Sequence, residues 1–217
     1  MTDLSRRDAL LALGAAPLAG LLDWSAPSIE RARKVVETLT TSGADAASYA
    51  PKFFTAHEWR TVRLLADLVI PRDARSGSAT DAKAPEFVDF MLAEHDTSER
   101  SRVAMRGGLA WLDTEMRRRA GHDFISATPT ERTALLDDIA YPKTAKPAYR
   151  AGADWFDHFR DRIGGAFFSS AMGWQDLRYM GNVFNPGWNG CPPAALDKLG
   201  VSYEAYDASL AARRRNG

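Results

Sequence analysis

Histidine side chains can transfer protons and bind metals, and one of the four histidines in this sequence has acidic residues close by. His158 lies near Asp154, Asp157 and Asp161. Asp154 and His158 are four residues apart, so on a helix they share one face, as two metal ligands could. Two ligands from one helix do not define a site without a third from elsewhere. We therefore favour a solvated acidic face, and an independent periplasmic enzyme built on this pair stays as an alternative.

Motifs for common nucleotide and hydrolase chemistry are missing from the sequence. It contains no G-x-G-x-x-G after a predicted strand, no phosphate-binding P-loop and no G-x-S-x-G nucleophile elbow. The adjacent acids Asp137 and Asp138 point to different sides of a helix and do not form an acid and base pair. The sequence thus predicts no catalytic residue, no cofactor-binding residue and no metal ligand in this chain.

Cys191 is the only cysteine, which excludes an internal disulfide and a cysteine-rich zinc or iron-sulfur site made by this chain alone. In an oxidising compartment a single cysteine is either a buried free thiol or a bridge to another chain. We favour the buried thiol, because free cysteine is among the most buried residue types.

The first residues are typical of a twin-arginine export signal. Ser5, Arg6 and Arg7 are followed by an uncharged stretch from Ala9 to Leu22, and a basic start before a modest apolar stretch is the pattern that export machinery recognises. This predicts a periplasmic protein that uses the twin-arginine translocase, a route that carries folded cargo. The stretch is shorter than the roughly 20 residues of a spanning helix, so a scaffold tethered to the membrane by a retained signal is the weaker alternative.

No clean cleavage motif marks the end of this signal. Gly14-Ala15-Ala16 is small but early, and Trp24-Ser25-Ala26 places a bulky ring where a small residue belongs. We assign residues 1–26 to the signal segment, 27–50 to a helix and linker, and 51–217 to a single helical domain.

Composition limits the class of protein. Apolar residues make up 45% and charged residues 26% of 217 residues, a mix that suits one globular domain. Basic and acidic residues number 28 each, so no net charge attracts the chain to nucleic acid, and we expect no nucleic-acid partner.

Helix signals recur along the chain. Thr55 and Glu58 form a predicted capping box, with Phe54 against Trp59 as a hydrophobic staple. No long alternating apolar pattern predicts a strand. The sequence therefore predicts an all-α fold, an irregular bundle of about five or six helices. The predicted helical stretches are 27–41, 55–70, 85 onward, 98–120, 128 onward, 149–168 and 193–210. In the 98–120 stretch we expect Val103 on the buried face. The 72–83 segment has almost nothing to bury and should be an exposed loop.

From Gly173 on we expect a long ordered C-terminal loop region rather than a helix. Its aromatic residues, among them Trp174 and Trp188, lie among Gly, Asn and Pro. Aromatic side chains in an irregular segment must be buried against their own core or another protein. We predict that Trp174, Trp188 and Cys191 lie at or near a partner surface.

Several stretches of the sequence together resemble the gluconate 2-dehydrogenase subunit 3 family. They are the Ser5-Arg6-Arg7 start, residues 53–71, residues 84–89, the Pro186-Gly187-Trp188-Asn189-Gly190-Cys191-Pro192-Pro193 ending and residues 199–203. This resemblance implies the small, non-catalytic subunit of a sugar, polyol or glucoside dehydrogenase complex. It implies that the small subunit escorts a large flavoprotein of the glucose-methanol-choline type, which holds FAD and passes electrons to the haem of a cytochrome c or another membrane acceptor. Association with the inner membrane would come through the signal or the complex.

Overall fold

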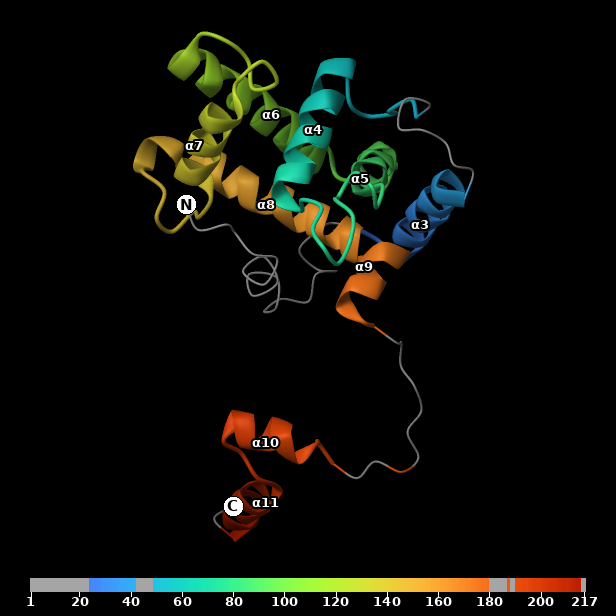
Figure 1. Ribbon diagram of the computed structural model, residues 1–217, viewed down its shortest axis with the longest axis vertical. Coiled ribbons are helices and arrows are strands. Elements are labelled where there is room, and N and C mark those ends of the chain that lie inside the picture. Colours follow the sequence, from blue (N-terminus) through green and yellow to red (C-terminus); the bar gives the residue numbers. More distant parts are fainter. Residues whose placement is uncertain (1–23, 42–48, 180–186, 188–189, 216–217) are drawn as a thin grey trace. The chain divides into compact units, whose positions relative to one another are not determined.

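The computed structural model describes residues 24–41, 49–179, 187 and 190–215 (Figure 1). This part of the chain contains nine α-helices, one short 3-10 helix and no β-strand. The chain divides into two compact units, with the boundary in sequence between residues 179 and 180. The helices are α3 (Ala26–Thr41), α4 (Ala56–Val69), α5 (Ala84–Ala93), α6 (Glu99–Ala120), α7 (Pro129–Ile139), η1 (Pro147–Tyr149), α8 (Arg150–Phe168) and α9 (Ala171–Leu177) in the first unit, and α10 (Pro193–Leu199) and α11 (Tyr203–Arg215) in the second.

The all-α prediction is confirmed, but the predicted five or six helices were too few. Residues 51–217, which we expected to form a single domain, are divided between the two units. The predicted signal and linker segments also contribute to the first unit, because α3 packs on α5 and Trp24 is buried ahead of it. Arg6, Arg7 and most of the predicted linker lie outside the described residues.

Local caps determine where α4 begins. The hydroxyl of Thr55 accepts the Glu58 N–H, and the Glu58 carboxylate accepts the Thr55 N–H at 2.8 Å, so the capping box is confirmed. The rings of Phe54 and Trp59 stack with centroids 6.3 Å apart. These contacts satisfy two backbone donors and fix the angle at which the chain enters the helix.

Helix α8 is central to the first unit. It runs across this unit in Figure 1 and contacts α4, α5, α6, α7 and α9. The stripe of aromatic and apolar residues on one side of α8 is buried and belongs to the core. Its members are Trp155, Phe156, Phe159, Ile163 and Phe167.

Two glycines allow α6 and α8 to approach closely. A Cβ added at Gly108 of α6 would lie 2.0 Å from the indole nitrogen of Trp155, and one at Gly152 of α8 would lie 2.3 Å from the ring of Trp111. Each helix therefore receives a tryptophan of the other where it has no side chain. The contact is reciprocal and fixes the register of the two helices.

Helix α5 is buried on nearly all sides and carries a buried acid that organises the preceding segment. The Asp89 carboxylate, which has no exposed surface, accepts the N–H groups of Lys52, Phe53 and Phe54 at 2.7 to 3.0 Å. It also accepts the Tyr49 hydroxyl at 2.8 Å. Burial, together with the Asp89 charge, raises the pKa of Tyr49 well above its ordinary range. This cluster ties the start of the 49–55 segment to α5.

Three local predictions were wrong. Val103 is 61% exposed, because it lies on the side of α6 opposite Leu112, whose face carries the core. The 72–83 loop buries Ala79 and Ala82, because the Asp67 carboxylate accepts the N–H and hydroxyl of Thr80 at 2.9 and 2.7 Å and thereby holds the loop against α4.

The third wrong prediction is the loop expected from Gly173 onward, since Gly173 and Trp174 belong to α9. A Cβ at Gly173 would lie 2.2 Å from the Phe167 carbonyl oxygen. The glycine is thus required for close contact between α9 and the end of α8, and it does not break the helix.

Candidate partner interface

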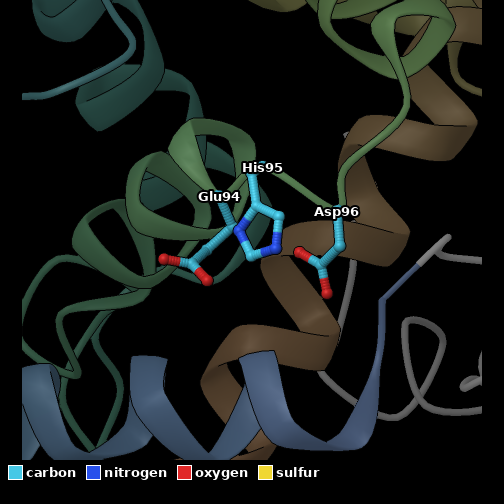
Figure 2. A group of neighbouring side chains, drawn as sticks. All are labelled: Glu94, His95 and Asp96. Atoms are coloured by element: carbon cyan, nitrogen blue, oxygen red, sulfur yellow. The ribbon is translucent and has the colours of Figure 1, made fainter.

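One group of side chains in the described part of the chain has the spacing of a metal site. Glu94, His95 and Asp96 each offer a ligand atom, and these atoms lie within 4.8 Å of one another. Figure 2 shows the three side chains directed from the end of α5 toward α3. The Asp96 carboxylate, however, accepts the hydroxyls of Ser28 and Ser25 at 2.6 and 2.7 Å. Glu94 also pairs with Arg31 of α3, so both acids of this group join α5 and the turn after it to α3 and its N-terminus.

The pair Asp154 and His158 does not gain a third ligand. Both side chains are exposed on α8, as expected for a solvated face. Neither belongs to a three-residue group of possible ligands among the residues that the structure describes. Burial raises the pKa of the neighbouring Asp161, and the charge of Asp157 raises it further. The acidic face therefore offers no defined site.

His57 has a structural role. Its Nε2 lies 2.6 Å from an oxygen of Asp113, a nearly buried acid of α6. The other Asp113 oxygen accepts the N–H of Phe124 at 3.1 Å. The pair therefore joins α4, α6 and the loop that follows α6.

The clearest candidate for recognition in the first unit is an apolar surface on α9, called here the α9 patch and made of Trp174, Leu177 and Tyr179. All three are exposed, Trp174 to 37% and Tyr179 to 52%. The rings of Trp174 and Tyr179 meet edge to face with centroids 5.7 Å apart. The guanidinium of Arg33 on α3 lies 4.6 Å from the Trp174 ring centroid. Aromatic rings beside arginine are the side chains most enriched in protein interfaces.

The α9 patch is held by a well-anchored helix. Ser170 caps α9 by accepting the Gly173 N–H at 3.1 Å. On its inner side the buried Asp176 forms an ion pair with Arg75 at 3.3 Å, and Arg75 also donates to the Asp176 carbonyl. The exposure of the patch is therefore a property of a packed helix and not of a frayed end.

A cavity opens beside the α9 patch between α3, α5 and the end of α8. Its volume is about 380 Å³, and its apolar wall includes Val36, Phe87 and Met172. Arg33 and Trp174 line it as well. The cavity thus continues the apolar surface of the patch inward, and its volume is enough for a side chain of a partner.

The second unit has an unusual pattern of burial. None of its described side chains is buried. Four large apolar residues of α10, α11 and the turn between them are exposed, Leu199 to 73%. Within this unit the Cys191 N–H donates to the Tyr203 hydroxyl at 2.7 Å. The four exposed residues are Leu199, Val201, Tyr203 and Tyr206.

The three predicted interface residues have different outcomes. Trp174 is exposed on α9, whereas Trp188 lies outside the described residues. Cys191 is a free, exposed thiol, so the favoured prediction of a buried thiol was wrong. The average burial of cysteine failed here because none of the described side chains of the surrounding unit is buried. Sequence reasoning missed Leu177 and the four apolar residues of the second unit as exposed surface. The signal for them was the presence of large apolar residues on short predicted helices.

Comparison with known families agrees with the sequence. A family model described as gluconate 2-dehydrogenase subunit 3 matches residues 56–187, more than half of the chain. The chain belongs to this family. As a gluconate 2-dehydrogenase subunit 3 protein it is a subunit of a dehydrogenase complex, and the resemblance proposed from sequence is confirmed. The match covers α4 to α9, including the α9 patch, and leaves α3, α10 and α11 outside.

Searches of curated proteins and of solved structures gave no match. Within the described ranges, no helix has the length and apolar character needed to cross a membrane.

Proposed function

We propose that this gluconate 2-dehydrogenase subunit 3 protein is the non-catalytic small subunit of its complex. It escorts, exports and stabilises a large FAD-dependent subunit of the glucose-methanol-choline type, which oxidises a sugar, polyol or glucoside. Arg6 and Arg7 direct both chains through the twin-arginine translocase to the periplasm. There the flavin of the partner passes electrons to an acceptor such as the haem of a cytochrome c.

The observation that carries this proposal is the second unit. Its described side chains include exposed Leu199, Val201 and Tyr206, and none is buried. So short a segment cannot bury enough apolar surface by itself to offset the entropy of ordering its backbone. A partner that covers these faces supplies the missing core. The large subunit of the same complex is the natural candidate, because family membership makes this chain a dehydrogenase subunit.

The α9 patch provides a second contact for the same partner. Trp174 and Tyr179 present rigid rings, and a buried ring contributes much interface area at a small loss of side-chain freedom. Cys191 is exposed, and in the oxidising periplasm its thiol is available for a bridge to a cysteine of the partner. Trp174, Trp188 and Cys191 are accordingly our proposed interface residues.

A supporting role also agrees with the polar groups of the first unit. The acidic groups of the described residues that could take part in chemistry form hydrogen bonds between structural elements. Asp96 bonds Ser28 of α3, Asp113 bonds His57 of α4, and Asp89 bonds the 49–55 segment. The proposal therefore assigns the redox chemistry to the partner, with no cofactor in this chain.

Co-expression tests the proposal. The full chain and its candidate large subunit are expressed together, and flavin-dependent dehydrogenase activity is measured in periplasmic and cytoplasmic fractions. The double variant R6K/R7K should leave both proteins in the cytoplasm, while the matched control R60K, at an exposed position of α4, should export normally. Periplasmic activity of the large subunit without this chain, or an isolated chain that oxidises a sugar, would refute the proposed role.

A further inference from the structure

We propose that the export signal is cleaved before Trp24 or not at all, so that Trp24, Ser25 and helix α3 remain on the mature protein. This inference rests on the proposed export and defines where its processing must end. Residues 1–26 were assigned to the signal from sequence, and two cleavage positions other than Gly14-Ala15-Ala16 are considered, the end of that segment and a later stretch of small residues. They are Trp24-Ser25-Ala26 and Ala44-Asp45-Ala46.

Trp24 is a member of the core of the first unit. Its side chain is 7% exposed, and its ring lies 5.6 Å from the ring of Phe87 on α5. The helix that follows buries Ala32 and Val36 in the same core. A removable signal peptide is not part of the folded domain, whereas Trp24 is buried like a structural residue of the core.

Ser25 is the N-cap of α3. Its hydroxyl oxygen accepts the Ser28 N–H at 3.3 Å, and its carbonyl accepts the Ile29 N–H at 3.0 Å. The Ser25 hydroxyl also donates to Asp96 at 2.7 Å, beside the fully buried Ser28. Cleavage after Ala26 would remove this cap and place a new positive charge at the positive end of the helix dipole, so it would destabilise α3.

The body of α3 is attached just as specifically. The Arg31 guanidinium pairs with Glu94, with Nε 3.1 Å from the carboxylate. Helix α3 packs on α5, and the guanidinium of Arg33 lies over the ring of Trp174 in the α9 patch. Cleavage after Ala46 would therefore uncover the core and remove one side of the proposed partner interface. Retention of α3 preserves both.

The direct test is the intact mass of the full chain after co-expression with its large subunit and recovery from the periplasm. We expect a mature N-terminus at Trp24 or upstream of it, including the uncut chain. An N-terminus at Ser25 or later overturns this inference and leaves the export proposal intact. A chain found uncut and only in the cytoplasm, with its partner exported, refutes the export proposal and this inference with it.

Variants of the full chain test the anchoring independently of export. Trp24→Ala should lower the melting temperature by about 5 °C or more, and Trp24→Phe should retain most of the stability, because the aromatic contact survives. Val103→Ala is the matched control at an exposed position and should change it little. If W24A cannot be purified folded while W24F and V103A can, the anchor is supported. Wild-type stability in W24A refutes it.

Discussion

Two adjacent glycines on α6 offer a matched pair of substitutions with opposite expected effects. Gly107 is exposed, and a Cβ added there meets no atom within 4 Å. Gly108 is buried, and a Cβ added there would lie 2.0 Å from Nε1 and 2.1 Å from Cδ1 of Trp155. Both alanines gain about 1 kcal/mol of helix propensity over glycine. Only the second must displace a buried ring.

The size of the clash sets the expected magnitude for Gly108→Ala. Non-bonded heavy atoms prefer separations of about 3.5 Å or more, so the indole must retreat by about 1.5 Å. Overpacking a core costs about 1–3 kcal/mol, and we expect the upper end because the obstructing atoms belong to a rigid ring. The net loss for G108A is then about 2 kcal/mol, against a gain of about 1 kcal/mol for G107A. For a chain of this size, the melting temperatures should differ by about 6–12 °C.

Thermal and denaturant unfolding of the full chain measure this difference. The double variant G108A/W155L should recover part of the loss, because the smaller side chain leaves room for the added methyl group. If G108A is as stable as G107A, or if W155L does not relieve it, the close contact of α6 and α8 through Trp155 is not as described.

Three further predictions concern buried acids and the second unit. Glu115→Gln should destabilise the protein at pH 7, because hydrogen bonds from Arg118 lower the pKa of Glu115 from its ordinary 4.5 to about 2. The stability that Glu115 contributes is complete above pH 4.5 and is lost as the pH falls toward 2. The unfolding curves of E115Q and wild type should therefore converge near pH 2. Asp89→Asn should cost about 2 kcal/mol or more in denaturant unfolding, because the amide cannot accept all the N–H groups that the carboxylate holds; equal stability would contradict this. Leu199→Asp should abolish capture of the large subunit in a pull-down without lowering the melting temperature of the isolated chain, whereas Asp197→Asn, an exposed control, should bind normally.

Features determined by neighbouring residues could be predicted from the sequence. The capping box at Thr55 forms as predicted, and Thr128 forms another with Glu131, again three positions later. Gly121 ends α6 with φ of 82°, a conformation that glycine adopts without steric cost. Each of these signals is complete within one helical turn, so no knowledge of the tertiary fold is needed.

Features determined by distant residues could not be predicted. Trp24 follows an export motif in sequence, and only its contact with Phe87 reveals it as core. Gly173 has the composition of a loop, and only its contact with the Phe167 carbonyl explains it within a helix. Val103 satisfies apolar spacing, but which face of α6 is covered depends on where α8 lies.

The candidate interface was predictable in part. Trp174 was chosen as an aromatic residue beside glycine, and it is exposed on α9. Its contact with a partner stays a prediction. The favoured prediction of a buried Cys191 thiol was wrong, because residue-type averages assume a core, whereas no described side chain of the second unit is buried.

Hydrogen exchange of the α10 and α11 amides, in the isolated chain and in the complex with the large dehydrogenase subunit, tests most directly whether a partner completes the second unit. We expect these amides to exchange rapidly in the isolated chain and at least about 100-fold more slowly in the complex, while α8 stays protected in both. Equal exchange of α10 and α11 in the two samples, or strong protection in the isolated chain, would contradict the proposal that this unit docks on the partner.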